Sequence, residues 1–310
     1  MALLARKKLI LAATETTYGV DVSPSGALNA IQTSDLSITP LAGPTVNRNL
    51  DRAAFGNDLQ IQVGTFVQLA FMVEWAGAGT AGDAPAWGPV LTACGFDEAL
   101  NVGVDAQYTP NSEDIDSLTI YFHHDGQKHA IVGARGTVSI NHSPGTIPKF
   151  AFSYTGLYVT PESTADPVVD LAGFVVPLPV NNQNTTKFDL HGAAQTMVEC
   201  SIDVAGEVVY RNVVGNESVE FIDRAPAGQI AIEAPAISVK DWFESARISE
   251  TGPLSMSHGL IEGNIVDFDA PLVQLISPSY GESDGIATIQ AALSLIPTSA
   301  GNDEMVITVK

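Results

Sequence analysis

Apolar and polar positions alternate along much of the chain, most regularly in residues 131–161 and 265–297. In each stretch two alternating runs flank a segment with a Ser-Pro pair, at 143–144 and at 277–278. Alternation with a period of two predicts half-buried β-strands, and Ser-Pro favours a turn, so each stretch is expected to form a β-hairpin. The similarity of the two stretches indicates two copies of one β-rich module.

The order of the other predicted elements repeats as well. A polar loop at residues 43–58 precedes a strongly alternating strand at 59–75, and a short helix is predicted at 85–96. The second half has a polar loop at 211–226, an alternating strand after it, and a short helix at 240–248. Long polar loops between strong strands are often interaction elements.

Length and composition are compatible with two domains. The chain has 310 residues and 45% hydrophobic content, enough for two packed cores. We expect module 1 at residues 1–165, with an extended N-terminal arm over the first 30 residues that contains a short strand-like segment at Leu9–Ala12, and module 2 at 166–310. The connector at about 162–194 is rich in Pro, Asn and Thr and is expected to provide the first strand of module 2. A final strand is predicted within residues 302–310.

The chain is strongly acidic. It has 14 Lys and Arg against 35 Asp and Glu, a net charge of −21. This charge argues against a general nucleic-acid or anionic-membrane binder, because either surface would repel the protein. Two interpretations stay open: the charge keeps the protein soluble, or one surface must face a polyanion without binding it.

The cysteines and the N-terminus indicate no secretion. Cys94 and Cys200 are too few for a disulfide framework or a cysteine zinc site, and both are expected to be buried. No run approaches the roughly 18 apolar residues that span a bilayer. The basic residues 6–8 precede an apolar run of about five residues, too short for a signal peptide. We expect synthesis in a cytoplasm and no membrane partner.

Candidate chemistry is sparse. His123, His124 and His129 surround Asp125-Gly126, a strong hairpin signal, and adjacent strand residues point to opposite faces. Hairpin ends are therefore favoured there over a metal site. Acidic clusters at 112–116 and 282–284 lack the spacing of a calcium loop. Nucleophile-elbow, zinc-protease and phosphate-loop motifs are absent from the sequence. We expect no catalytic residue, metal or cofactor, and no enzyme.

Several segments together suggest a family. KKLILAATETTYGVD, NAIQTSDLSITP, VNRNLDR and ALSLIPTSAGNDEMVITVK, with the late hairpin, resemble major tail tube proteins of long non-contractile-tailed bacteriophages, the siphophage tail tube family. The resemblance covers essentially the whole chain and rests on the order of elements. It implies a mainly β fold of two tandem tail-tube-type β-sandwich or half-barrel modules, each with one short flanking α-helix.

The resemblance also implies a function. Family members are structural virion proteins that join edge strands into rings with a closed inner barrel, and the rings stack into the tail tube, a conduit for genome ejection. Two modules per chain would give a trimeric, pseudo-hexameric ring. The implied partners are further copies of the chain, the tape-measure protein, and the tail terminator and tail-tip proteins. Double-stranded DNA would pass an acidic lumen without specific binding, and the protein would reside in the virion tail after synthesis in the host cytoplasm.

The resemblance directs attention to two sets of residues. Lumen-facing positions are expected on the polar face of the strand at 59–75 and of its counterpart in module 2: Gln60, Gln62, Gln68, Glu74, Gln229 and Glu233. The loops at 43–58 and 211–226 are expected to stack ring on ring through Arg48, Arg52, Arg211 and Arg224. The alternative for these arginines, local pairing with Asp51 and Asp223, stays open.

A second functional class is a two-module β-sandwich binding protein, such as a virion or cell-surface adhesin. Glycan binding would favour clustered exposed aromatic residues in loops. Only 7% of the residues are aromatic, and most occupy alternating strand positions. A hydrolase with an unrecognised site is the third possibility.

Overall fold

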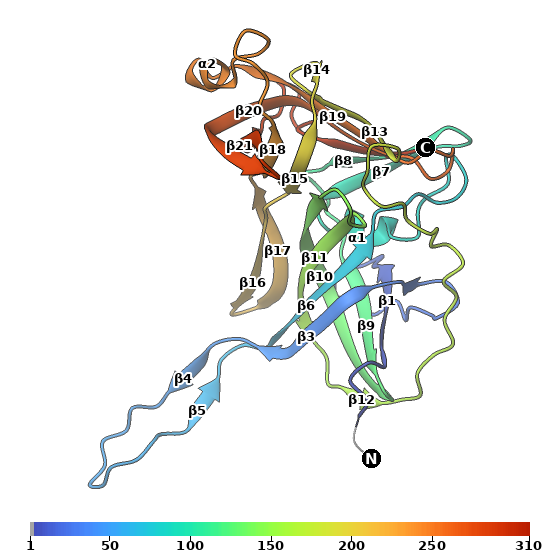
Figure 1. The fold of residues 1–310 in the computed structure, drawn as a ribbon. Coiled ribbons are helices and arrows are strands. Elements are labelled where there is room, and N and C mark those ends of the chain that lie inside the picture. Colours follow the sequence, from blue (N-terminus) through green and yellow to red (C-terminus); the bar gives the residue numbers. More distant parts are fainter. Residues whose placement is uncertain (1–2) are drawn as a thin grey trace.

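The chain folds into antiparallel β-sheets with two short helices (Figure 1). The structure is a computed structural model and describes residues 3–310. Within them, neither helix has the length and apolar character needed to cross a membrane. The elements of the first half are β1 (Lys8–Thr14), β2 (Ala30–Ile31), β3 (Ser34–Ala42), β4 (Thr45–Asn47), β5 (Gln60–Gln62), β6 (Phe66–Glu74), α1 (Gly88–Thr92), β7 (Phe96–Asn101), β8 (Asp105–Pro110), β9 (Leu118–His124), β10 (Gln127–His142), β11 (Lys149–Tyr158) and β12 (Glu162–Ser163).

The second half has the remaining strands and one helix. Its elements are β13 (Thr185–Leu190), β14 (Ala193–Ala194), β15 (Met197–Asp203), β16 (Gly206–Val213), β17 (Asn216–Arg224), β18 (Ala227–Glu233), α2 (Trp242–Arg247), β19 (Thr251–His258), β20 (Val266–Ser283), β21 (Ile286–Leu295) and β22 (Val306–Val309). The mainly β fold with two short helices confirms the predicted class, although both helices are shorter than the predicted ranges.

Strand pairing follows the same path in the two halves. The first half runs β1-β9-β10-β11-β6-β3 across the sheet, and the second half runs β13-β19-β20-β21-β18-β15. The long strands β10 and β20 hold corresponding places. Each has a register shift along its length, and a bulge bends a strand so that it can serve two sheet layers.

Apolar side chains between the layers form the core. The largest fully buried side chains include Trp75, Trp87, Tyr108 and Phe150, and the rings of Trp87 and Phe150 lie 4.8 Å apart. Aromatic residues of this size bury the most apolar area per residue, so they dominate the stability of the core. Cys94 and Cys200 are both buried and free, as expected.

Two strand pairings join the halves. β15 pairs with the end of β10, and the C-terminal strand β22 lies between β20 and β8. The predicted final strand is confirmed, with Met305, Ile307 and Val309 buried on one face. The hairpin at Asp125-Gly126 is also confirmed, since the two residues form the turn between β9 and β10.

The predicted turn at Ser277-Pro278 is wrong. β20 continues through both residues, and the chain reverses at Asp284-Gly285, where both φ angles are positive. Ser277 has φ 49° and lies where the β20–β21 register shifts. The Ser-Pro pair therefore marks a bulge in a strand, a site that also tolerates a missing backbone donor.

Three other segments differ from expectation. In the predicted N-terminal arm the short strand is present but longer, since residues 8–14 form β1 and pair with β9 along their whole length, so this part belongs to the sheet and is not an arm. Residues 1–2 lie outside the described residues. The strand predicted at 59–75 is split into β5 and β6. The loop predicted at 211–226 forms the end of β16, the turn, β17 and the two residues that precede β18. In each case tertiary pairing, which local pattern does not specify, decides the outcome.

Candidate functional site

One sheet runs through both halves. Its strand order is β3-β6-β11-β10-β15-β18-β21-β20, with every neighbouring pair antiparallel. The β10–β15 pairing makes it continuous. Within the described residues, β3 and the last part of β20 have a partner on one edge only, so both ends of this sheet present unpaired backbone groups.

The sheet has one apolar face and one polar face. Phe71, Phe152, Ile140, Ile202 and Ile230 point into the core from successive strands. Antiparallel partners share a face, so the registers define the residues of the opposite face. Small and polar side chains dominate it: Gln68, Ala70, Ser153, Thr137, Ala151, Ser139, Asn141, Ser201, Asp203, Gln229, Ala231, Gln290, Ala292 and Ser294. We call this surface the polar face.

The polar face is acidic. Glu74, Glu199, Asp203 and Glu233 lie on it, from strands β6, β15 and β18. Lys149 lies opposite Glu74 in register, and its Nζ donates a hydrogen bond to Ser34 Oγ at 2.9 Å. Carboxylates gathered on one surface create a negative potential, which repels a polyanion before it touches the protein.

The β10–β15 junction is a regular ladder over buried side chains. Ser139, Ile140, Asn141 and His142 face Asp203, Ile202, Ser201 and Cys200, and Val204 N donates to Val138 O at 3.1 Å.

His142 closes the buried side of the junction. Its ring meets the Trp75 ring edge-on, with centroids 4.8 Å apart. Burial, with a smaller contribution from nearby His258, lowers the pKa of His142 to about 3. The imidazole is therefore neutral at physiological pH and packs as part of the core.

The β16–β17 hairpin folds back onto the first half of its own chain. Gly206 N donates to Thr137 Oγ1 at 2.9 Å, and the Tyr210 ring lies 4.8 Å from the Phe66 ring. Val219 is fully buried, and its N–H donates to Tyr18 Oη at 2.5 Å.

A cation strengthens the attachment of this hairpin. Arg135 Nη1 contacts Glu220 at 2.9 Å and Val219 O at 3.0 Å, while its Nη2 donates to Ile115 O at 2.9 Å. The hairpin thus covers one end of the polar face through apolar, hydrogen-bonded and charged contacts together.

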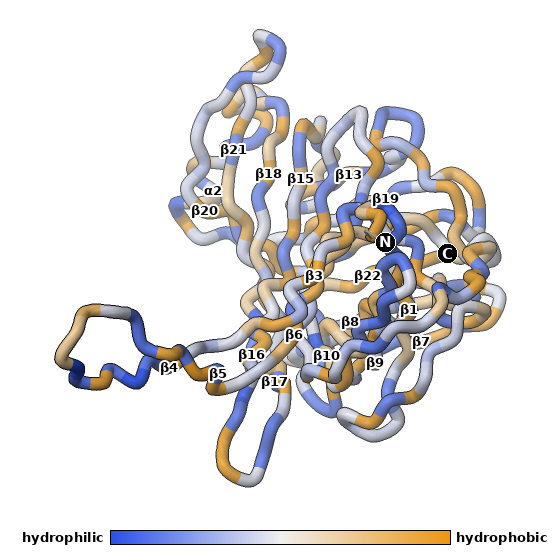
Figure 2. The backbone as a smooth tube through the Cα atoms, turned by 90° about the horizontal axis from the view of Figure 1, so that it is seen from below, coloured by the Kyte–Doolittle hydropathy of each residue, from blue (hydrophilic) through white to orange (hydrophobic). Residues whose placement is uncertain are grey.

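The β4–β5 hairpin, with its connecting loop, projects away from the body; we call residues 43–64 the arm (Figures 1 and 2). Among the described residues its hydrogen bonds are internal, as from Thr45 to Gln60 and from Leu50 N to Asp58. Its apolar side chains are exposed to solvent: Val46, Leu50, Phe55, Leu59, Ile61 and Val63. Exposed apolar residues gathered on one projection indicate a contact surface.

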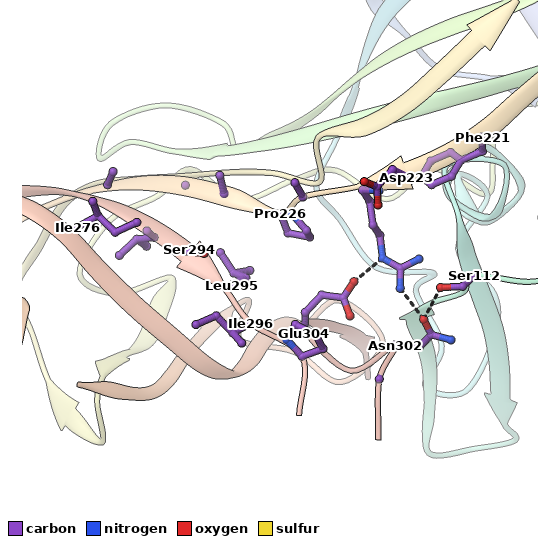
Figure 3. A pocket seen from close by; sticks show the side chains of 18 of the residues that line it. Ser112, Phe221, Asp223, Pro226, Ile276, Ser294, Leu295, Ile296, Asn302 and Glu304 are labelled. Carbon is purple, nitrogen blue, oxygen red and sulfur yellow. Dashed lines mark hydrogen bonds and ion pairs between the residues drawn. The ribbon is translucent and has the colours of Figure 1, made fainter. Parts of the chain in front are cut away.

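Arg224 lies at the root of the β16–β17 hairpin and is held inside the subunit by contacts with Glu304 and Asn302, both labelled in Figure 3. Its guanidinium pairs with Glu304, donates to Asn111 O at 2.6 Å and donates to Asn302 Oδ1 at 2.6 Å. The side chains of Arg224 and Glu304 are only 9% and 4% exposed. Asp223 Oδ1 accepts the backbone N–H of Arg224 at 2.8 Å.

The sequence-predicted residues fall into three groups. Gln68, Glu74, Gln229 and Glu233 lie on the polar face, whereas Gln60 and Gln62 lie on the arm, because the strand breaks at residues 63–65. On the arm, Arg48 and Asp51 are exposed, and Arg52 pairs with Asp58 rather than with Asp51. Arg211 is exposed on β16, while Arg224 is engaged within the subunit.

Sequence reasoning missed the junction and its neighbours. Glu199 and Asp203 belong to the polar face, but only the β10–β15 register places them beside module 1 residues. Alternation in MVECSID marks a strand without naming its partner. Tyr18 and Arg135 gave no local signal at all, since their partners are 201 and 85 residues away.

In the described residues no three His, Cys, Asp or Glu side chains gather as a metal site.

A family model described as "Phage tail tube protein" matches residues 5–298, nearly the whole chain. No curated protein matches the chain. That family is a structural one, whose members are components of the virion tail. The extended antiparallel sheet, its open edges and its acidic polar face suit such a role. The chain belongs to the phage tail tube protein family.

Proposed function

We propose that copies of this chain join edge to edge into rings, with β3 of one copy paired to β20 of the next. The observation that carries the proposal is the β10–β15 junction. In it the last strand of one four-strand unit pairs with the first strand of the following unit inside one chain. β20 and β3 occupy the corresponding places and have free edges. Pairing between them removes an exposed edge that would otherwise favour uncontrolled association.

The internal junction also supports a register. Each row of paired residues across the first four-strand unit has a counterpart in the second. The row Thr39, Gln68, Thr155 and Arg135 corresponds to the row Asp203, Ala227, Ser294 and Gln274, so Thr39 holds the place of Asp203. At the internal junction Asp203 pairs with Ser139, and Ser279 holds the place of Ser139 in the second unit, because Ser139 faces Ala151 and Ser279 faces Gln290. Thr39 of one copy is therefore expected opposite Ser279 of the next, and Ile38 opposite Tyr280. Pro40 and Pro278 meet at the end of this ladder, where neither can donate a hydrogen bond.

Three copies would complete a ring. The repeated pairing order supports a tandem duplication, with module 1 at residues 1–165 and module 2 at 166–310, the connector being 162–194. The resemblance to tail tube proteins implies six modules in a ring, so two modules per chain would give a trimeric, pseudo-hexameric ring.

The polar face would line the lumen of this ring. Glu74, Glu199, Asp203 and Glu233 would turn a negative surface toward double-stranded DNA, and small side chains would leave a smooth wall. Repulsion of phosphates prevents the adhesion that cationic surfaces produce. Physiological salt screens charges over about 8 Å, so the effect acts close to the wall. The DNA would pass without specific binding during genome ejection.

Stacking of rings is assigned to the arm. Its tip carries Arg48, Asp51 and Arg52, and Arg211 lies on the hairpin that corresponds to it. Asp223 is an exposed carboxylate near the hairpin root. The intrasubunit contacts of Arg224 support a role in holding that root rather than in stacking. Tape-measure, terminator and tail-tip proteins are the expected partners in the tail, and the chain would be made in the host cytoplasm.

Electron microscopy and light scattering on the purified chain, with and without tail-tip components, test the proposal. Rings or tubes with a central channel are expected, together with a trimer in solution. Tyr280 is 63% exposed, so Tyr280→Asp should leave the subunit folded but abolish rings by placing a charge in the edge interface. A chain that stays monomeric with tail-tip components present, or a Tyr280→Asp variant that assembles normally, would contradict it.

A further inference from the structure

A groove of about 890 Å³ lies at one end of the polar face in the second half (Figure 3). Apolar residues from β18 and the residue before it, from β20 and β21, and from the segment after β21 form much of its wall: Pro226, Ala227, Ile276, Leu293, Leu295 and Ile296. The neighbouring root of β17 contributes Ile222, which is exposed.

The corresponding surface of the first half is covered by the β16–β17 hairpin. There, Thr137 on β10 accepts a bond from the β16–β17 hairpin, and Phe66 at the start of β6 lies under Tyr210. Thr137 faces Ser153 on β11, and Ile276 faces Ala292 on β21, so Ile276 holds the place of Thr137 in the second unit. The groove is therefore the counterpart of a docking surface that is already filled in the first half.

The two hairpins are rooted alike. β16–β17 follows β15, which pairs with β10, and crosses β10 and β11. The arm follows β3, which has a free edge. Val219 in β16–β17 is 0% exposed, whereas Val46 and Ile61 at the root of the arm are 52% and 48% exposed. The arm is therefore a hairpin like β16–β17, but within residues 3–310 it does not pack on a sheet surface of its own subunit.

We propose that the root of the arm of one copy docks in this groove of the next copy. The inference rests on the proposed ring: once β3 pairs with β20 of the next copy, the arm must cross β20 and β21 of that copy, as β16–β17 crosses β10 and β11. Val46, Ile61 and Val63 then bury against the apolar wall of the groove. The tip at residues 48–58 stays beyond the groove and is available for stacking.

The geometry favours a second copy over the same chain. Figures 1 and 2 show the arm leaving the body beside β3 and pointing away from β18, β20 and β21, the strands that line the groove. Free β3 and β20 edges lie at opposite ends of the continuous sheet. An arm from a neighbour that pairs along β20 enters the groove beside that strand.

Cross-linking between two variants that each carry one added cysteine tests the contact. Ile61→Cys places a thiol on the arm root of one copy and Ile222→Cys places one beside the groove of another. The native Cys94 and Cys200 are 0% and 2% exposed, so a short bismaleimide should leave them unreacted in the folded protein. A mixture of the variants, with tail-tip components present, should yield a cross-linked dimer on a denaturing gel. Ile61→Cys mixed with Val239→Cys is the matched control, since Val239 is exposed away from the groove.

The outcomes separate this inference from the proposed function. A dimer from the first mixture and none from the control supports docking in the groove. Rings or tubes in the microscope without the cross-link would overturn the docking and leave the ring proposal standing. Absence of both rings and cross-link would overturn the two together.

A charge variant gives a second measurement. Val46→Asp with Ile61→Asp should leave the melting temperature of the subunit unchanged, because both side chains are exposed there. Burial of two carboxylates in an apolar groove should raise the protein concentration needed for assembly by tenfold or more. Val239→Asp should leave that concentration unchanged. Normal assembly of the double variant would overturn the proposal.

Discussion

The β16–β17 hairpin and the β4–β5 arm hold corresponding positions in two similar halves, yet one is packed and the other projects into solvent. Each follows the first strand of a four-strand unit. β16–β17 finds β10 and β11 of the preceding unit within its own chain, and Val219 is completely buried. Within the described residues the outer edge of β3 pairs with no strand, so the arm that follows β3 has no such surface beside it. The contrast links the exposure of the arm to the free edge of β3.

The largest difference should come from one substitution made in each hairpin. Val219→Asp puts a carboxylate into a fully buried site and should lower the free energy of unfolding by about 4 kcal/mol or more, whereas Val46→Asp, at an exposed site, should change it by less than about 0.5 kcal/mol. Urea denaturation of the two isolated variants measures both values. Similar losses in the two variants would mean that the arm also packs within the subunit.

The root of the packed hairpin provides the next test. Arg224→Ala leaves the nearly buried Glu304 carboxylate without its cation and should cost about 3 kcal/mol of unfolding free energy. Arg211→Ala, on the exposed side of the same hairpin, is the control and should cost under about 0.5 kcal/mol. If the two variants lost the same unfolding free energy in thermal or urea unfolding, Arg224 would not be the residue that holds the root of the hairpin.

Acid should weaken the in-chain junction in a defined pH window. The pKa of His142 is about 3 in the folded protein and near 6.5 in an unfolded chain. Below pH 6.5 the unfolded chain therefore binds a proton that the folded chain excludes, and stability falls as pH decreases from 6.5 toward 3. The loss from this residue should reach about 2 kcal/mol at pH 5.

Comparison of His142→Gln with the parent chain isolates that contribution. The difference in unfolding free energy between pH 7 and pH 5 should be smaller in the variant. An unchanged pH dependence would show that other groups cause the acid loss. At the proposed junction between chains, the place of His142 corresponds to the exposed Glu282, so assembly and folding should respond differently to acid.

The smallest effect is expected at the arm tip. Arg52→Ala removes the pair with Asp58 on an exposed hairpin, and such pairs contribute about 0–1 kcal/mol. Subunit stability should barely change, while tube length or stacking, measured by electron microscopy, should fall if the tip joins rings. Arg52→Lys should retain part of the stacking. Tubes of normal length from Arg52→Ala would exclude Arg52 from the contact.

Local patterns predicted the elements whose partners are close in sequence. Asp125-Gly126 joins two strands that pair directly, and period-two alternation identified β10, β11 and the inward face of β6. The same signals failed where a Ser-Pro pair marked a bulge instead of a reversal. The chain reverses seven residues after Ser277, at Asp284-Gly285. The pairing of β20 with β21 determines which of the two sites forms the turn.

The polar face was predicted in part for a related reason. Gln68, Glu74, Gln229 and Glu233 follow from alternation, because residues two apart share a face. Gln60 and Gln62 continue the same alternation, but the chain leaves the sheet at residues 63–65 for the arm. The burial of Arg224 with Glu304 joins residues 80 apart. No periodicity in either segment specifies that contact.

The β10–β15 ladder changes how assembly depends on concentration. A junction within one chain forms during folding and does not dissociate on dilution, since its partners remain tethered at an effective concentration of order millimolar. In the proposed ring, half of the six junctions would be of this kind. Closure would then require the collision of three bodies instead of six, so dilute subunits should nucleate a tube more readily than single-module subunits with equally strong edges.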